Sequence, residues 1–105
     1  MPQINRITLL KLADPSIIQQ AVQKYSTLAR DAKKDGKTYI LTAAANPTHD
    51  DARNQGYTLV ARTVFASKED MYFYDNECEA HGDIKALLKP NVGGPPLVVY
   101  MDATE

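Results

Sequence analysis

Residues 4–15, INRITLLKLADP, join an apolar strand to the start of a helix. Within residues 4–12 both alternating sets of positions are largely apolar, which indicates a strand with both faces covered. Asp14 and Pro15 then mark a helix start. An acidic N-cap accepts from free backbone N–H groups, and proline at the first helical position lacks the N–H that would be left without a partner. The strand therefore needs a layer on each face, and a helix follows it directly.

The next segments carry helix and strand patterns in turn. The first helix is expected to end at residues 33–36, KKDG, where lysines meet the negative end of the helix dipole and glycine permits a left-handed turn. Residues 38–42 are predicted as the second strand, and the polar residues 43–55 as a long loop or hairpin tip. One apolar stripe runs along the first helix, formed by Ile18, Ala21, Val22, Tyr25, Leu28, Ala29 and Ala32.

The second half of the chain repeats this alternation. Residues 57–65 alternate regularly and predict a third strand. Ser67, followed by acids in the first turn, begins a helix that runs through residues 71–74 and loosens at residues 75–79. A short helix over residues 81–88, a Gly/Pro turn over 91–96 and a last strand over 97–101 complete the pattern.

The element order β-α-β-β-α-β predicts a ferredoxin-like α+β sandwich, as a single domain over residues 1–105. Two right-handed crossovers build one four-stranded antiparallel sheet with both helices on the same face. The other face, which no helix covers, is called the open face. Soluble monomers rarely expose such an apolar face to water, so we predict a homodimer in which two open faces pack into one barrel. The open face is expected to carry Ile7, Leu9, Val60 and Val64, with Val98 and Tyr100 added from the last strand.

Composition excludes several classes of partner. The 105 residues are 44% hydrophobic and 24% charged with a formal net charge of −1, so there is no basic field for nucleic acid or anionic lipid. No apolar run approaches the roughly 18 residues that a membrane-spanning helix needs, and the first residues lack the features of a secretory signal. Cys78 is the only cysteine, which excludes an intramolecular disulfide and fits a reducing compartment. We therefore expect a soluble cytoplasmic protein that binds neither nucleic acid nor membrane.

Several short motifs, taken in order, resemble the stress-responsive A/B-barrel domain family of small dimeric α/β-barrel proteins. They are ITLLKL at residues 7–12, Gly56-Tyr57-Thr58, Val64-Phe65, Tyr74 followed by His81, and LVVYMDA at residues 97–103. The resemblance covers nearly the whole chain and implies the same dimeric barrel. Members of this architecture include stress-induced proteins without an assigned reaction, polyketide cyclases of the olivetolic acid cyclase type, and small monooxygenases.

The resemblance to these cyclases also implies a site. They hold their acid and base groups in a cavity between the sheet and the helices. Tyr74 and His81 match two of their four groups, so the resemblance assigns catalysis to this pair. Arg6 and Leu59 stand where the cyclases have histidines, and leucine cannot transfer a proton. A cofactor-free cyclase, lyase or oxygenase-like enzyme and a non-catalytic, stress-related dimer that binds a ligand or self-associates therefore both stay open.

The alternation of side chains along the strands places four of them on the helix side of the sheet, facing a cavity. We predict that these four side chains, together with Tyr25 of the first helix, bind the substrate. A tyrosine and a histidine that share a cavity polarise a carbonyl and move a proton near neutral pH. An arginine beside them holds a carboxylate or enolate through two parallel hydrogen bonds. The expected ligand is a hydrophobic small molecule that bears a carbonyl. The four strand residues are Arg6, Thr8, Leu59 and Thr63.

Structural roles are the alternative for each of these residues: Arg6 with its head in solvent, Tyr74 in the core, and His81 capping a helix turn. Acidic residues alternate along residues 75–83, which invites a site for a hard cation. Gly82 loosens the geometry there, and acidic runs are usually only solvated, so we expect no metal and no cofactor. Cys78 is expected to be structural, and His49 in the polar loop to be a surface residue.

Overall fold

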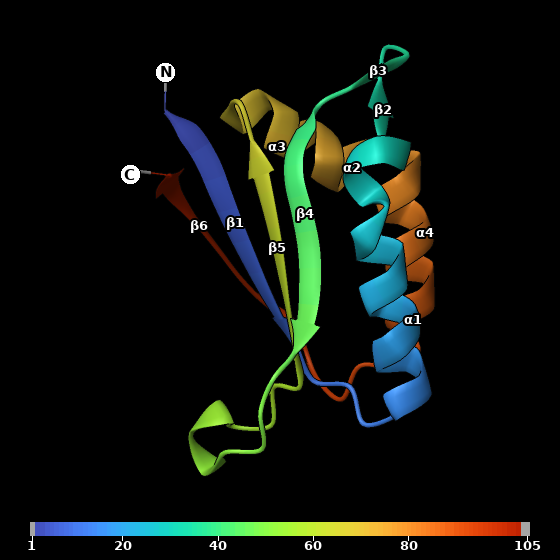
Figure 1. Ribbon diagram of the computed structural model, residues 1–105, viewed down its shortest axis with the longest axis vertical. Helices are drawn as coiled ribbons and strands as arrows, with labels where there is room; N and C mark the ends of the chain where they lie inside the picture. Colours follow the sequence, from blue (N-terminus) through green and yellow to red (C-terminus); the bar gives the residue numbers. More distant parts are fainter. Residues whose placement is uncertain (1, 104–105) are drawn as a thin grey trace.

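The structure is a computed structural model that describes residues 2–103, and its fold is ferredoxin-like (Figure 1). One four-stranded antiparallel sheet has the strand order β4-β5-β1-β6, and the helices lie on one of its faces. The strands are β1 (Gln3–Leu10), β4 (Ile40–Pro47), β5 (Leu59–Phe65) and β6 (Leu97–Ala103). The helices are α1 (Pro15–Ser26), α2 (Leu28–Asp31), α3 (Lys68–Asn76) and α4 (Glu79–Leu88). The predicted fold class and the order of its main elements are confirmed.

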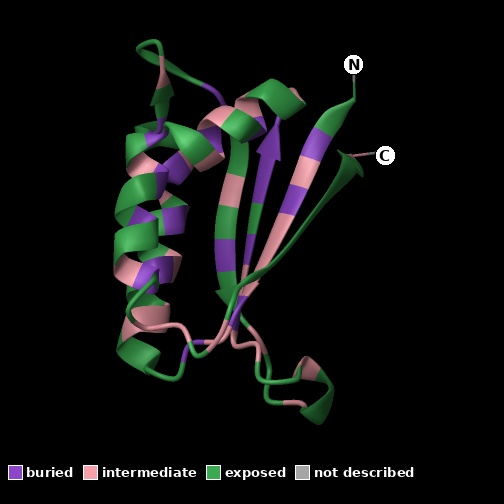
Figure 2. Cartoon of the chain, turned by 180° about the vertical axis from the view of Figure 1, so that it is seen from behind, coloured by how far each residue is buried: buried purple, intermediate pink, exposed green. Residues whose placement is uncertain are grey.

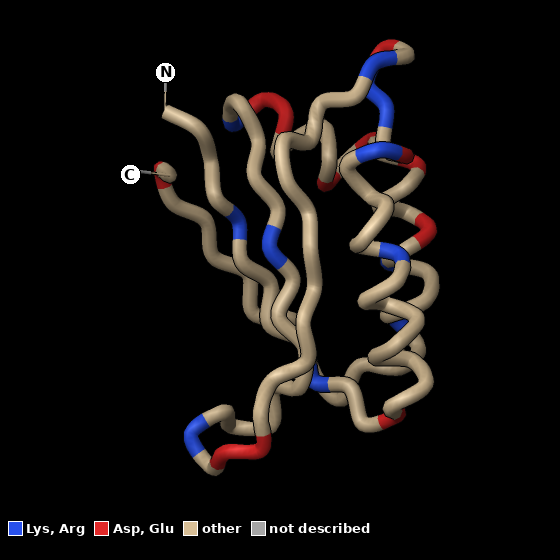
Figure 3. Tube along the Cα trace, in the orientation of Figure 1, with Lys and Arg blue, Asp and Glu red and all other residues tan. Residues whose placement is uncertain are grey.

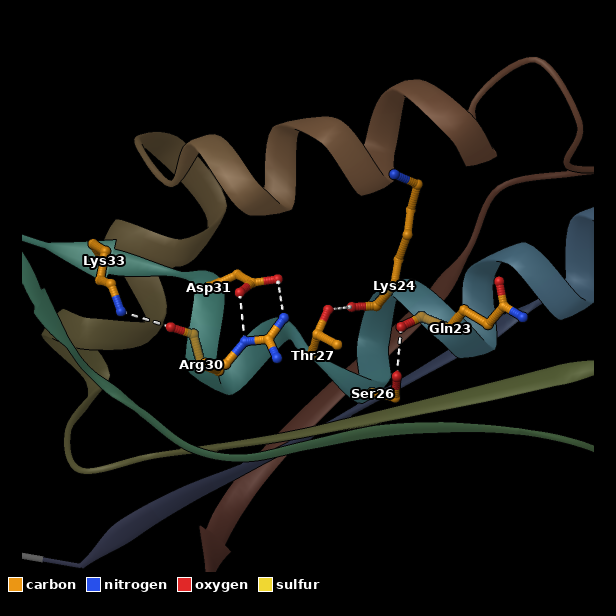
Figure 4. A network of polar contacts seen from close by, with 7 residues as sticks. All are labelled: Gln23, Lys24, Ser26, Thr27, Arg30, Asp31 and Lys33. Atoms are coloured by element: carbon orange, nitrogen blue, oxygen red, sulfur yellow. Dashed lines mark hydrogen bonds and ion pairs between the residues drawn. The ribbon is translucent and has the colours of Figure 1, made fainter.

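The first helix begins where the sequence predicts and ends earlier. The Asp14 side chain accepts from the Ser16 N–H at 2.8 Å, with Pro15 at the first helical position. At the other end the Ser26 hydroxyl donates to the main-chain oxygen of Gln23 at 2.6 Å, and the Thr27 hydroxyl approaches that of Lys24 at 3.5 Å (Figure 4). Hydroxyl groups that bond nearby carbonyls compete with the helix. The helix is therefore divided at Thr27, and α2 completes the predicted stripe.

The second strand is longer than predicted, and it follows a small hairpin. Strands β2 (Lys33–Lys34) and β3 (Lys37–Thr38) pair across a turn in which Asp35 and Gly36 have positive φ. Strand β4 then continues to Pro47, so the prediction of a loop from residue 43 is wrong. Ala43 and Ala45 lie opposite Thr63 and Ala61 of β5. Alanine has a low strand propensity, and pairing with β5 overrides it.

The register of β1 corrects one predicted surface. Arg6 lies opposite Tyr100 and Thr8 opposite Val98 on β6, and directly opposed residues share a face. Val98 and Tyr100 therefore lie on the helix side of the sheet, and their predicted place on the open face is wrong. A strand read one residue out of phase exchanges its two faces. From β6 the open face instead receives Leu97, Val99 and Met101.

The hydrophobic core fills the space between the helices and three of the four strands, β4, β5 and β1. Figure 2 shows this layer in purple, whereas β6 is exposed along almost its whole length. No helix within residues 2–103 combines the length and apolar character needed to cross a bilayer. The largest fully buried side chains are Tyr74, Phe65, Leu12, Leu28, Leu59 and Ile84.

The Gly56-Tyr57-Thr58 motif joins the start of β5 to the end of β1. Gln55 and Gly56 both have positive φ, and the chain then turns into the sheet. The Thr58 hydroxyl accepts from the Leu12 N–H at 2.9 Å and donates to the Leu12 carbonyl oxygen at 2.7 Å. A single side chain thus satisfies both main-chain groups of a residue just beyond β1.

We expect Thr58→Val to lower the free energy of unfolding by about 1–3 kcal/mol, because it leaves two main-chain groups of Leu12 without their partner. The matched control is Thr38→Val on β3, whose side chain is exposed, with an expected change within about 0.5 kcal/mol. Urea denaturation followed by circular dichroism measures both variants. Equal stability of the two would contradict the role given to Thr58.

Candidate active site

A cavity of about 280 Å³ lies between the β1–β6 edge of the sheet and helices α1, α3 and α4. One part of its wall is apolar, formed by Leu10, Leu88, Val92, Pro96 and Val98. The remainder is polar or charged, formed by Arg6, Thr8, Tyr25, Asp75, His81, Lys85 and Lys89. A cavity with an apolar wall and a few convergent polar groups is the usual form of a small-molecule site.

Three side chains from different elements form a stacked column beside this cavity. The Tyr74 ring of α3 lies against the His81 ring of α4, with centroids 3.6 Å apart and planes within 7°. The guanidinium carbon of Arg6 on β1 lies 5.2 Å from the centroid of the Tyr74 ring. All three residues are buried, with 7% of Arg6, 2% of Tyr74 and 6% of His81 exposed. Stacking between two buried neighbours leaves each ring little freedom to turn.

A hydrogen bond to the main chain selects the tautomer of His81. Its Nδ1 lies 2.8 Å from the carbonyl oxygen of Tyr74. A carbonyl oxygen only accepts, so Nδ1 carries the proton and Nε2 of the neutral ring carries the lone pair. Nε2 has no hydrogen-bond partner within residues 2–103, and His81 lines the cavity. Nε2 of the neutral ring is therefore a hydrogen-bond acceptor that the described residues leave free.

The environment keeps His81 neutral. The pKa of His81 is lowered to about 4, chiefly by burial and also by the positive charges of Lys85 and Arg6, while the hydrogen bond to the Tyr74 carbonyl and the charge of Asp75 act in the opposite direction. At neutral pH the imidazole is uncharged and its Nε2 lone pair is free. Negative charge that develops in the cavity during a reaction would stabilise the protonated ring.

Arg6 forms an ion pair with Asp75 of α3 through Nη1 and Oδ1. The Lys85 ammonium donates to the main-chain oxygen of Asp75 at 2.9 Å, which leaves the Asp75 carboxylate to Arg6. The arginine that was predicted to face this cavity is therefore buried at its edge and held by a counter-ion. Its alternative role, with the head in solvent, does not agree with this burial.

The two tyrosines of the predicted site lie differently. Tyr25 lines the cavity, whereas Tyr74 lies between Arg6 and His81 in the core. Burial raises the pKa of Tyr25, and the Tyr74 hydroxyl and the Arg6 charge partly offset this. Burial is also the main cause that raises the pKa of Tyr74. Both phenols are therefore neutral hydrogen-bond donors at physiological pH.

The structure brings together part of the predicted substrate-binding set. Arg6, Thr8 and Tyr25 line the cavity with His81. Leu59 and Thr63 share the helix side of the sheet, but they are buried under the core and do not line the cavity. The catalytic roles of Tyr74 and His81 remain predictions.

Lys85 and Lys89 are cavity residues that the sequence analysis missed. Residues 81, 85 and 89 are spaced four apart, so all three lie on one face of a helix and its extension. Asp75, read as part of a possible cation site, is instead the counter-ion of Arg6. Within residues 2–103 no group of three His, Cys, Asp or Glu side chains is placed to hold a metal ion. Cys78 is buried, and His49 is exposed.

A second, larger hollow of about 650 Å³ lies on the open face of the sheet. Asn5, Arg62, Val64 and Met101 contribute to its lining. Figure 3 shows that charged residues are sparse along the sheet and frequent on the helices and on the loop between β4 and β5. This hollow contains neither histidine nor tyrosine, so the smaller cavity on the helix side is the candidate active site.

Comparison with known proteins identifies the family. Residues 4–103 match the Stress responsive A/B Barrel Domain, and the chain belongs to this family. A curated relative, the Fusaristatin A biosynthesis cluster protein of Gibberella zeae, is 38% identical over 86 residues, which are 82% of this chain and 62% of the relative. The chain thus spans less than two thirds of the length of that relative.

Solved structures share the fold at low sequence identity. A dimeric protein of unknown function and ferredoxin-like fold from Bacteroides fragilis aligns over 96% of both chains with a TM-score of 0.78 and 13% identity. Hydroxynitrile lyase from Passiflora edulis aligns over 99% of this chain and 95% of its own, with a TM-score of 0.72 and 15% identity. At these identities the comparison shows the common architecture.

The low pKa of His81 makes folding depend on pH. Between the ordinary value of 6.5 and the folded value of about 4, the unfolded chain binds a proton that the folded chain does not. The contribution of His81 to stability is therefore complete above pH 6.5 and is lost as the pH falls towards 4, by roughly 3 kcal/mol at the limit.

We expect the free energy of unfolding of the wild type to fall more steeply between pH 6.5 and 4 than that of His81→Gln, whose side chain does not titrate. His49→Gln, in the exposed loop, is the control and is expected to keep the wild-type slope. Urea denaturation at a series of pH values measures all three. Parallel curves for wild type and His81→Gln would show that His81 is not desolvated as described.

Proposed function

We propose that the chain is a homodimeric, cofactor-independent enzyme that performs acid–base chemistry on a hydrophobic small molecule bearing a carbonyl. The observation that carries this proposal is the arrangement of His81. Its Nδ1 proton is held by the Tyr74 carbonyl, its Nε2 is unpaired within residues 2–103, and positive side chains share its cavity. This arrangement supports a general base that abstracts a proton next to a carbonyl group.

The proposed reaction begins with proton transfer from a carbon atom adjacent to the carbonyl to His81 Nε2. The C–H electron pair moves into the carbonyl group and forms an enolate. Lys85 stabilises its negative charge, and Tyr25 is available to donate a hydrogen bond to the oxygen. The enolate carbon then attacks a second carbonyl of the same molecule. The resulting alkoxide takes the proton back from Nε2, which completes an aldol-type cyclisation; the reverse sequence breaks the carbon–carbon bond as a lyase does.

The relatives support this class of chemistry. The fungal relative is described by its place in a biosynthesis cluster, and the Passiflora protein is a lyase. None of these proteins supplies a substrate for this chain, so the proposal is limited to the reaction class.

The open face of the sheet supports the homodimer. Leu97, Val99 and Met101 of β6 are 41–45% exposed on this face, next to Ile7 and Leu9 of β1. A flat, apolar edge strand is prone to uncontrolled association unless another surface covers it. The Bacteroides protein of the same fold is dimeric. A second copy that packs its own open face here would cover both sets of side chains.

Exchange of protons for deuterium tests the catalytic part of the proposal. In D2O, the wild type is expected to accelerate exchange at the carbon between the two carbonyls in at least one of a panel of alkyl-substituted 1,3-diketones and 3-oxo acids, followed by NMR. His81→Gln is expected to lower this rate about 100-fold or more, because it removes the base. The control His49→Gln, outside the cavity, is expected to keep the wild-type rate. Equal rates for wild type and His81→Gln would refute the proposal.

Native mass spectrometry tests the dimer. The wild type is expected at twice 11.6 kDa, and Val99→Asp on the open face is expected at the mass of a monomer, since it places a charge in the apolar interface. Gln19→Asp, on the exposed side of α1, is the matched control and is expected to remain dimeric. A wild type that is monomeric at micromolar concentration would contradict the covered open face.

A second function is favoured by a specific observation. Leu59 and Tyr74 are buried in the core, so two of the four positions that carry chemistry in the resembled cyclases do not reach the cavity here. A stress-related dimer that binds a ligand without converting it agrees with this. Absence of exchange with every compound, together with a copurified small molecule released on denaturation, would favour this second function.

A further inference from the structure

Arg6 retains hydrogen-bonding capacity that the chain does not use. Asp75 bonds a single nitrogen, Nη1. Nε is buried without any partner, and the second terminal nitrogen makes no hydrogen bond within residues 2–103. A guanidinium presents its N–H groups as a rigid fork, and Nε with the adjacent terminal nitrogen forms the edge that bonds carboxylates in pairs. Nε itself is closed to the cavity, so the second terminal nitrogen is the donor that a ligand can reach, and a ligand that bonds it gains affinity.

The charges around the cavity are also unbalanced. Arg6, Lys85 and Lys89 line it together with one acid, Asp75. His81 is neutral, so the lining carries an excess of two positive charges. Lys85 bonds the main-chain oxygen of Asp75 and not its carboxylate, so its charge is not compensated by that contact. A neutral ligand would leave this excess in place, whereas an anion would reduce it.

The apolar part of the wall defines the rest of the ligand. Leu10, Leu88 and Val98 are among the apolar side chains that line the cavity together with the cations. This wall offers no charged partner, so one end of the ligand must be apolar. The volume of about 280 Å³ is at the lower limit for ligand cavities and suits a small molecule with one charged group.

We infer that the ligand is an apolar carboxylate, and that Arg6 anchors its carboxylate through the terminal nitrogen that Asp75 leaves free. This inference rests on the proposed function and names its substrate class: a carbonyl compound that also carries an acid group. Asp75 is then a positioning residue that orients the guanidinium. Lys85 and Tyr25 remain at the cavity for the carbonyl oxygen.

Two probes that have the same alkyl chain and different polar head groups test the inference. Octanoate and octanamide, each below its aggregation concentration, are titrated into the intact protein by calorimetry, and the binding site is mapped by amide NMR. Octanoate is expected to bind at least tenfold more tightly than octanamide, with shifts at residues of α4, and added salt is expected to weaken octanoate alone. Equal affinities, or no measurable binding of octanoate, would overturn the inference.

Variants assign the preference to Arg6. Arg6→Gln is expected to remove most of the preference for octanoate over octanamide, and Arg6→Lys, which keeps the charge without the planar guanidinium, to reduce the preference at least threefold. Arg62→Gln on the open face is the matched control and is expected to keep the full preference. If Arg6→Gln does not fold, Arg6→Lys decides the question. An unchanged preference in the folded Arg6 variants would overturn the inference.

The outcome is separable from that of the proposed function, because binding is measured without turnover. His81→Gln is expected to lose proton exchange while it keeps the preference for octanoate. A wild type that prefers octanoate but exchanges no protons would support the carboxylate site and refute catalysis. A wild type that exchanges protons of neutral diketones but binds both probes equally would refute the carboxylate site alone.

Discussion

The pairing of β1 with β5 on one side and β6 on the other is the constraint on which the site depends. This register places Arg6 opposite Thr63 and Tyr100, and so turns it towards the helices. A shift of one residue would turn Arg6 to the open face and place Ile7 among the helices. The apolar side chains of β1 on its helix side, Ile4 and Leu10, make such a shift costly because both are almost completely buried.

From this register the chemistry of the cavity follows through contacts between distant segments. Arg6 meets Asp75, which is 69 residues further along the chain, and the Tyr74 ring separates the guanidinium from His81. The Tyr74 carbonyl holds the proton of His81 on Nδ1. One residue of α3 thus positions the imidazole of His81 through its ring and through its backbone. Tyr74 therefore acts on the site without lining the cavity.

Much of the fold was predictable because its signals are local. Asp14 with Pro15 and the alternation of residues 57–65 each depend on neighbours within one element. The end of α1 at Ser26 and the strand from Ala43 to Pro47 were not predictable in this way, since hydroxyl–carbonyl bonds and pairing with β5 override the local pattern. In the site, Lys85 and Lys89 resemble ordinary solvated lysines until the position of α4 shows that they border a cavity.

The sequence by itself determined the order of elements, the apolar phases of β1 and β5 and the membership of the chain in its family. Each of these depends on residues that are close together in the chain or on the order in which motifs follow one another. Only the tertiary structure decided which face of β6 carries Val98 and Tyr100, that Arg6 is buried with a counter-ion, and that His81 is neutral with its proton on Nδ1. These properties arise from strand register and from loss of solvent, and both depend on segments that are brought together only when the chain folds.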